Sequence, residues 1–308
     1  MQAFGKFWSL IQSSTPFPQF GIFIKVDTGY GRAGARIGTL EFDSLVTRVA
    51  TTDGFKGFYS HLGSSYSGSD QQDAMNGLDQ ELRELDRAAS SFQLNLGGKK
   101  LTLSVGATPT ATAAQNLAIE SVAGSKQYDY LKERYNVELH AGVYPLLDLQ
   151  QLATHARDIH TDPKDEFEPL SLDNIGLKIL VEITSLYDDR SKPEALIAAG
   201  SLALGREPCK SYPGWGVVAN DMGNQGGTVY DADGEKTGWI VGRISQEHGI
   251  LSWEGPKDSM KRLSIGDKLL IWPNHACVAA AGFGWYLIID SEKGGNEVVD
   301  VWVRWRGW

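Results

Sequence analysis

The sequence is poor in cysteine and in basic residues, and it has no long apolar run. Its two cysteines, Cys209 and Cys277, cannot build a disulfide framework, which favours a reducing compartment. Lys and Arg number 29 against 38 Asp and Glu, so the net charge is −9 and the basic footprint of a nucleic-acid-binding protein is missing. No apolar run approaches the ~20 residues of a membrane helix, and no signal peptide is recognisable. We therefore expect a cytoplasmic protein that binds neither nucleic acid nor membrane.

The chain has enough hydrophobic residues to build a substantial core. Hydrophobic residues make up 42% of its 308 positions, and charged residues make up 22%. This length and composition are typical of one large or two ordinary globular domains. The 35 glycines favour a loop-rich enzyme.

The first half alternates segments typical of strands and of helices. Strands are expected at 20–26, 55–61, 100–105 and 136–140, and helices at 40–49, 70–92 and after residue 110. The second of these helices carries apolar residues at spacings of four, four, three and four, namely Ala74, Leu78, Leu82, Leu85 and Ala89. The alternation predicts parallel βαβ units.

The second half changes character after the polar stretch that ends at Pro169. Strand candidates then follow one another with only turns between them, at 177–186, 237–245, 268–272, 284–290 and 297–305. This pattern predicts a mainly antiparallel β domain. We place the boundary near residue 165, which gives domains 1–165 and 166–308.

The number of βα units leaves two folds open for the first domain. The sequence shows about four units, whereas a closed (β/α)₈ barrel has eight. Four parallel strands alone would leave open edges, which native sheets normally cover. The segment is therefore either an open doubly wound sheet or part of a barrel.

Pro273-Asn-His-Ala-Cys277 is the first candidate for chemistry. If the segment is a strand, His275 and Cys277 share a face and point at one metal ion. An imidazole and a thiolate suit zinc better than magnesium or calcium, and only two protein ligands indicate a catalytic site with open positions. The alternative is a small buried cysteine beside a hydrogen-bonded histidine.

Two strand ends are candidates for binding a phosphate. Gly106-Ala-Thr-Pro-Thr110 follows a strand and opens a helix, and backbone N–H groups with a Thr hydroxyl form an anion site there. Ala141-Gly-Val143 follows the next strand in the same way. Neighbouring strand ends facing one phosphate agree with the usual place of sites in parallel sheets. Ordinary turn chemistry is the alternative for either segment.

Three further segments have both a functional and a structural interpretation. His61-Leu-Gly-Ser-Ser-Tyr66 can hold a planar cofactor or form a polar loop, and Lys25 and Asp27 can form an ion pair beside Arg32. Glu247 and His248 follow a strand, where they are either site residues or part of a surface turn.

Taken in order, these segments resemble the eukaryotic zinc-dependent D-serine dehydratases, most closely the fungal branch. That family is grouped with D-threonine aldolase among the alanine-racemase-like folds. The spelling His-Ala-Cys distinguishes it from the aldolases, which have His-x-Asp at this point. The matching stretches, which span about residue 18 to the last residue, are 23–34, 57–66, 104–110, 139–144, 242–249, 273–277 and 301–308.

The resemblance implies a homodimeric lyase made of an alanine-racemase-type barrel and a β domain. Pyridoxal phosphate would act on D-serine while a lysine removes the α-proton, and zinc would make the β-hydroxyl a better leaving group. Elimination would give pyruvate and ammonia.

The resemblance also assigns site residues. His275 and Cys277 would bind zinc, and Tyr66, Thr108, Gly142 and Val143 would contact the cofactor, the last three around its phosphate. Arg32 would lie near a cofactor or substrate oxygen.

The sequence departs from the family in two places. Val143 stands where the family usually has Asn, which keeps a backbone N–H but no side-chain contact. The Schiff-base lysine, which the family carries in a segment resembling Arg-Pro-His-x-Lys-Thr-His-Lys, is not present. We interpret the chain as the C-terminal two-thirds of a D-serine dehydratase, with part of the barrel absent. The alternatives are an inactive zinc-binding remnant and a lyase for other D-β-hydroxy amino acids such as D-threonine.

Overall fold

The chain forms two compact units. The computed structural model describes residues 20–52, 54–91, 100–118, 125–157, 169–219, 228–295 and 297–305. Unit 1 is Met1–Ala141 with Ala156–Asp158, and unit 2 is Gly142–His155 with Ile159–Trp308. The domain boundary expected near residue 165 and the last three residues of the C-terminal motif lie outside the described residues. Within the described ranges, no helix has the length and apolar character needed to cross a membrane.

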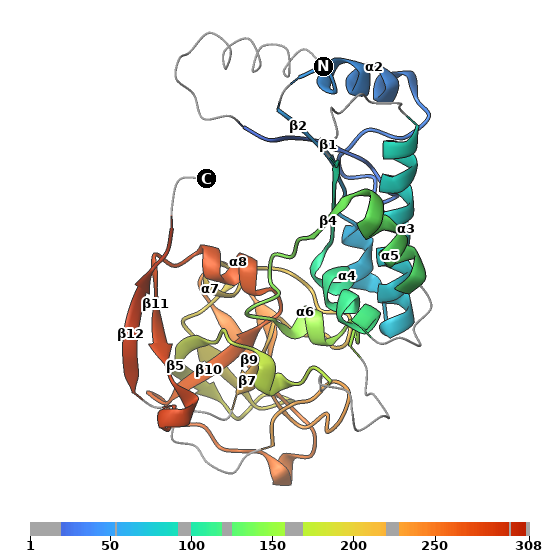
Figure 1. Ribbon diagram of the computed structural model, residues 1–308. Coiled ribbons are helices and arrows are strands. Elements are labelled where there is room, and N and C mark those ends of the chain that lie inside the picture. Colours follow the sequence, from blue (N-terminus) through green and yellow to red (C-terminus); the bar gives the residue numbers. More distant parts are fainter. Residues whose placement is uncertain are drawn as a thin grey trace. The chain divides into compact units, whose positions relative to one another are not determined.

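Four parallel strands in the order β1-β2-β3-β4 form the sheet of unit 1 (Figure 1). Helices or 3₁₀ turns follow the first three strands. The elements, in chain order, are β1 (Ile22–Lys25), α2 (Leu40–Val49), β2 (Phe55–Tyr59), η1 (Gly63–Ser67), α3 (Gln71–Ser90), β3 (Thr102–Val105), α4 (Thr108–Ala113), η2 (Ala114–Ala118), α5 (Ser125–Arg134) and β4 (Asn136–Leu139). The parallel pairing confirms the βαβ units predicted from the sequence.

Helix α3 is the longest helix described, and its sequence explains its limits and its buried face. The Asp70 side chain accepts a hydrogen bond from the backbone N–H of Asp73 and caps the first turn. The apolar stripe that includes Leu78 and Leu85 is buried against the sheet. It packs there against one residue from each of three neighbouring strands, and these residues are in register: Ile24, Phe58 and Leu103.

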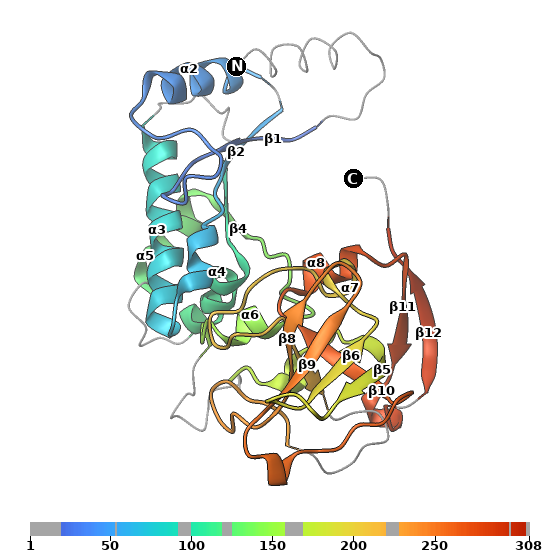
Figure 2. The same ribbon diagram turned by 180° about the vertical axis from the view of Figure 1, so that it is seen from behind.

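The other face of this sheet is polar. One residue further along each strand is a row of register partners across β1 to β4, namely Lys25, Tyr59, Ser104 and Glu138. Because side chains alternate along a strand, this polar row points away from α3. Helices α3 and α5 lie on the same face of the sheet in both views (Figures 1 and 2).

The two candidate phosphate segments have different local structures. After β3, Gly106 and Ala107 lead directly into α4, as expected. After β4, Val143 starts a turn in which its carbonyl oxygen accepts from the N–H groups of Leu146 and Leu147, at 3.1 and 2.8 Å. Gly142 and Val143 therefore precede a turn and not a helix.

Six antiparallel strands form a closed barrel in unit 2, in the order β10-β5-β6-β9-β8-β7 (Figure 2). The expected antiparallel structure is thus confirmed, but three of its strands, β6, β7 and β9, were not expected. Two of these have only four residues, which is too short for a clear alternation of apolar and polar positions. The strands are β5 (Ile179–Tyr187), β6 (Glu194–Ile197), β7 (Gly216–Ala219), β8 (Gly238–Ile244), β9 (Gly249–Glu254) and β10 (Lys268–Pro273).

The last two strands of unit 2 form a separate antiparallel pair. They are β11 (Trp285–Ile289) and β12 (Val298–Val303), and both were expected from the sequence. The helices of unit 2 are short, namely α6 (Leu149–Leu152), η3 (Leu172–Asn174), α7 (Ser201–Leu204), η4 (Lys257–Ser259), α8 (Ala276–Ala281) and η5 (Ser291–Lys293).

Candidate metal and cofactor sites

The candidate zinc ligands lie at the start of a helix, so the strand expected across residues 273–277 is wrong. Strand β10 ends at Pro273, His275 is the N-cap residue of α8, and Cys277 is in its first turn. Proline cannot donate a ladder hydrogen bond, and the alanine-rich sequence that follows favours a helix. The face-sharing argument from a strand therefore does not apply to His275 and Cys277.

Asn274 fixes the chain where it leaves the strand. Its side chain is 1% exposed. The amide nitrogen donates to the carbonyl oxygens of Glu207 and Gly214 at 2.9 and 2.8 Å. The amide oxygen accepts from the Tyr212 hydroxyl at 2.6 Å. The polar groups of the Asn274 side chain thus all have hydrogen-bond partners inside unit 2. These hydrogen bonds hold the adjacent His275 in a defined position.

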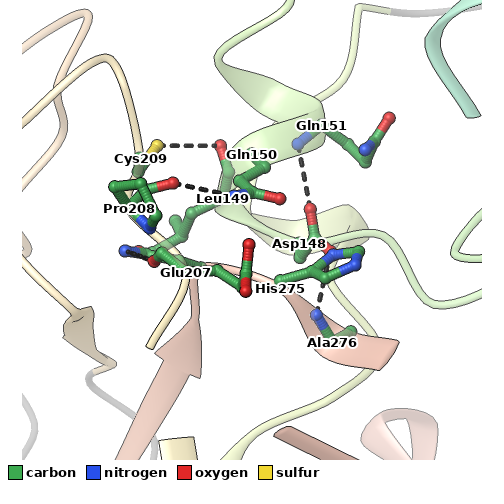
Figure 3. A network of polar contacts seen from close by, with 10 residues as sticks. Asp148, Leu149, Gln150, Gln151, Glu207, Pro208, Cys209, His275 and Ala276 are labelled. Carbon is green, nitrogen blue, oxygen red and sulfur yellow. Dashed lines mark hydrogen bonds and ion pairs between the residues drawn. The ribbon is translucent and has the colours of Figure 1, made fainter. Parts of the chain in front are cut away.

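Asp148 connects the starts of two helices (Figure 3). Its Oδ1 accepts from the backbone N–H of Gln151 at 2.9 Å, which caps α6. Its Oδ2 accepts from the backbone N–H of Ala276 at 2.9 Å, in the first turn of α8, and lies 3.1 Å from His275 Nδ1. The residue is 0% exposed. A buried carboxylate thus contacts one of the two candidate ligands directly.

Cys277 lies beside Gly142. A Cβ atom added at Gly142 would be 3.7 Å from Cys277 Sγ, so the glycine leaves space next to the sulfur. The side chain keeps part of its surface exposed. Partial burial, and then the Asp148 carboxylate, raise the pKa of the Cys277 thiol.

The donor set fits a soft divalent cation with open positions. An imidazole and a thiol two positions apart in sequence are zinc ligands by chemistry. Because the pKa of the Cys277 thiol is raised, a bound cation would have to displace its proton. Among the described residues no group of three or more His, Cys, Asp or Glu side chains is arranged as a metal site. Two protein ligands with open positions are typical of a catalytic zinc site.

Aromatic and basic side chains gather at the carboxyl ends of the unit 1 strands. The Tyr59 and His140 rings are stacked with centroids 4.3 Å apart, and His61 is 6.4 Å from His140. Lys25 Nζ lies 5.4 Å from the centre of the Tyr59 ring. Ser104 Oγ contacts His140 Nδ1 at 3.0 Å. This cluster lies at the carboxyl ends of the strands, where sites of parallel sheets are found.

The cluster favours uncharged imidazoles. Burial, and then the Arg32 guanidinium, lower the pKa of His61. Burial, and then His61, lower the pKa of His140. His140 Nε2 is buried and has no hydrogen-bond partner among the described residues, so a polar atom of a bound molecule would satisfy it.

Acidification is expected to destabilise unit 1. Since the pKa of both imidazoles lies below the ordinary 6.5 in the folded state, the unfolded chain binds protons first as pH falls. Their contribution is complete above about pH 6.5 and is lost as pH falls through the lowered pKa values. Unfolding temperatures between about pH 7.5 and pH 5 should fall less steeply for His140→Gln than for the wild type.

His248→Gln is the control for that comparison. His248 is exposed in the turn between β8 and β9, and its replacement should leave the pH slope unchanged. A His140→Gln slope equal to the wild-type slope would contradict a role for the neutral rings in stability.

The remaining sequence candidates are distributed over the two units. Tyr66 is half-buried in η1, and Thr108 is the first residue of α4. Arg32 is exposed, with its guanidinium 5.3 Å from the Tyr30 ring centre. These three belong to unit 1, whereas Gly142 and Val143 belong to unit 2.

The structural alternative holds for Glu247 and His248, but the one expected for Lys25 and Asp27 is wrong. Glu247 and His248 form an exposed turn in which His248 O accepts from Ser245 N. Asp27 Oδ1 accepts from the N–H groups of Gly29 and Gly31, and its ion pair is with Arg36. An ion pair between Lys25 and Asp27 is therefore not formed.

Glu81 is a buried polar residue that the sequence analysis did not identify. It is 0% exposed on α3. Its Oε1 accepts from Ser60 Oγ and from Leu62 N, both at 2.9 Å, and its Oε2 accepts from Thr110 Oγ1 at 3.0 Å. Burial raises its pKa. One carboxyl group therefore joins the loop after β2 to the start of α4.

Two family models match successive parts of the chain. "Alanine racemase, N-terminal domain" matches residues 11–123, and "Putative serine dehydratase domain" matches residues 176–289. The first match covers most of the parallel sheet, and the second covers β5 to β11.

Curated relatives match over almost the whole chain. The D-serine dehydratases of Saccharomyces cerevisiae and Schizosaccharomyces pombe are each 31% identical, over 298 and 297 residues. Each alignment covers 94% of this chain, but only 63% and 61% of the two yeast proteins. The chain thus spans less than two thirds of their length. D-threo-3-hydroxyaspartate dehydratase of Delftia sp. is 28% identical, with 66% of that protein covered.

Solved structures agree with this grouping. An alanine-racemase-like protein of Idiomarina loihiensis matches 99% of this chain and 70% of its own, with TM-score 0.71 and 23% identity, which shows the fold. The Delftia dehydratase matches 99% of this chain and 69% of its own, with TM-score 0.64 and 25% identity. Its solved variants replace a histidine and, two positions later, a cysteine, and the cysteine variant is described as metal-free. The chain is thus a homologue of the fungal D-serine dehydratases over 94% of its length, and it carries both domain matches.

Proposed function

We propose that the protein carrying this sequence is a zinc- and pyridoxal-phosphate-dependent D-serine dehydratase that forms pyruvate and ammonia by β-elimination. The observation that carries the proposal is the His275–Cys277 pair at the start of α8, held by the buried Asp148. The Delftia enzyme supports it: separate variants replace a histidine and a cysteine with the same spacing as His275 and Cys277, and the cysteine variant is in a metal-free form.

The metal would be held by His275 and Cys277. Zinc supplies a Lewis acid to the β-hydroxyl that leaves in the reaction. Gly142 keeps the space beside Cys277 Sγ open, so a side chain does not compete with a third ligand there. The partial exposure of Cys277 gives the cation and the substrate hydroxyl a way in.

The cofactor would be held by the residues that the family resemblance assigns to it, of which Arg32, Tyr66 and Thr108 lie within the alanine racemase match. Pyridoxal phosphate supplies the electron sink for loss of the α-proton. In unit 1, Thr108 and the N–H groups at the start of α4 would bind a phosphate oxygen. In unit 2, the backbone N–H groups of Gly142 and Val143 are separate candidates for the same role. The ring of Tyr66 would pack on the cofactor, and Arg32 would meet a cofactor or substrate oxygen. Because the pKa values of His61 and His140 are lowered, both imidazole rings favour the uncharged form.

We also propose that the parallel sheet is part of a (β/α)₈ barrel wall, in a domain that ends near residue 165 and precedes a β domain at 166–308. A doubly wound sheet has helices on both faces, whereas here α3 and α5 share one face and the other carries the polar row from Lys25 to Glu138.

The proposed enzyme is a cytoplasmic homodimer. The two free cysteines suit a reducing compartment. One face of the β11–β12 pair presents exposed apolar residues that a second chain would cover, including Trp285, which is 57% exposed, and Val303, which is 74% exposed.

The activity is tested by ammonia release from D-serine, L-serine and D-threo-3-hydroxyaspartate, using the natural protein with added pyridoxal phosphate. We expect D-serine to be the preferred substrate, with D-threo-3-hydroxyaspartate turned over at least about tenfold more slowly and L-serine not turned over. A zinc chelator should abolish turnover, and added zinc should restore it.

Three results would contradict the proposal in different ways. A preference for D-threo-3-hydroxyaspartate would favour the second candidate function, to which the 28% identity with the Delftia enzyme points. Turnover that survives the chelator would remove the metal role. Zinc binding without any turnover would favour an inactive zinc-binding protein.

A further inference from the structure

We propose that Asp148 is the positioning residue of the zinc site, which fixes the His275 ring so that Nε2 is the nitrogen that binds the metal. This inference rests on the proposed zinc site at His275 and Cys277. It concerns a residue 127 positions away in sequence from the histidine that it contacts.

The hydrogen bonds around Asp148 determine which His275 nitrogen carries the proton. Backbone N–H groups can only donate, and Asp148 accepts from two of them, Gln151 N at Oδ1 and Ala276 N at Oδ2. Both carboxyl oxygens are therefore acceptors. His275 Nδ1, at 3.1 Å from Oδ2, must be the donor. In a neutral imidazole the lone pair is then on Nε2, which is the arrangement of carboxylate–histidine–zinc sites.

The surroundings keep this arrangement rigid. Asp148 is 0% exposed, and its position is set by the start of α6 on one side and the start of α8 on the other. The His275 side chain is 19% exposed, so water competes little for the contact. The Cys277 thiolate and the Asp148 carboxylate together would balance the two positive charges of a divalent cation at this site.

Asp148→Asn tests the inference because it keeps the shape and removes one acceptor. Whichever way the amide is turned, its NH₂ group would face a backbone N–H donor, at Gln151 or at Ala276. We expect zinc affinity, measured by competition with a chelator, to fall by roughly 10–100-fold. Asp70→Asn is the matched control, since Asp70 also caps a helix through a backbone N–H but lies in the other unit. It should leave zinc affinity unchanged.

A second measurement needs no metal and no variant. Nitrogen NMR of the metal-free wild-type chain should show His275 protonated at Nδ1 and not at Nε2, and this readout stands even if Asp148→Asn does not fold. Protonation at Nε2 in the wild type would overturn the inference. So would wild-type zinc affinity in a folded Asp148→Asn protein. Absence of zinc binding by the wild type, with the Nδ1 proton present, would instead overturn the proposed zinc site.

Discussion

Replacing Cys277 with alanine is expected to remove zinc from the protein and to abolish D-serine dehydration. The thiolate is one of two protein ligands in the proposed site, and a single imidazole holds zinc weakly. Zinc affinity should fall by at least about 100-fold, since even the loss of an outer-shell contact costs 10–100-fold. The Lewis-acid contribution is several kcal/mol, which corresponds to a rate loss of about 10²–10⁴. Metal content and ammonia release are measured on the same preparation.

The other cysteine provides the control. Cys209 is 6% exposed, and its Sγ donates to the Leu149 carbonyl oxygen at 3.5 Å. Cys209→Ala should keep the zinc content of the wild type, apart from a modest loss of stability from the small cavity. Retained dehydration by Cys277→Ala without bound zinc would contradict the metal role. Equal zinc loss in both cysteine variants would show that the effect is not specific to Cys277.

Replacing Glu81 with alanine is expected to lower the free energy of unfolding of unit 1 by roughly 2–4 kcal/mol. The change removes the acceptor for Ser60 Oγ, Leu62 N and Thr110 Oγ1. Ser60 and Thr110 have second contacts, with Thr28 Oγ1 at 2.7 Å and Ala107 O at 3.2 Å. Within the described part of the chain, the Leu62 N–H has no second acceptor besides Glu81, and an unsatisfied buried donor costs about 1–3 kcal/mol.

Glu81→Gln is the matched variant. Its amide oxygen can accept from Ser60 and Leu62, and its NH₂ group can donate to Thr110 Oγ1. Because burial raises the pKa of Glu81, ionisation at neutral pH opposes folding, and an uncharged amide avoids that cost. We expect Glu81→Gln to stay within about 1 kcal/mol of the wild type.

Urea unfolding followed by two signals separates the units. All tryptophans except Trp8 belong to unit 2, whereas the long helix α3 belongs to unit 1. Glu81→Ala should shift the helical circular-dichroism transition and leave the tryptophan fluorescence transition in place. An unshifted helical transition would show that the carboxyl group does not hold the loops of unit 1 together.

The sequence was sufficient for most of the fold because its signals are local. The alternation of apolar residues predicts α2, α3 and the four parallel strands with small shifts at their ends. The short strands β6 and β7 were missed because four residues carry little periodicity. Closure of the barrel was also missed, because it depends on pairings between strands far apart in sequence, such as β10 with β5.

The site was predictable in its residues but not in its geometry. His275 and Cys277 stand out by residue type, yet the segment's conformation depends on Asn274, whose amide contacts reach residues about 60 positions away. Asp148 has a local signal, since an Asp before Leu149 suggests a helix cap, but its contact with His275 is visible only in the folded chain. Glu81 lies on the apolar face of α3 between Leu78 and Leu85, and a charged residue there was a signal that the sequence analysis passed over.

X-ray absorption spectroscopy at the zinc edge tests the proposed site most directly. The purified 308-residue protein should hold one zinc ion with one sulfur ligand at about 2.3 Å and one imidazole nitrogen at about 2.0–2.1 Å, the distances of Cys and His ligands. The Cys277→Ala protein should lack the sulfur signal. Wild-type protein that takes up no zinc, or zinc surrounded only by nitrogen and oxygen, would contradict a metal centre at His275 and Cys277.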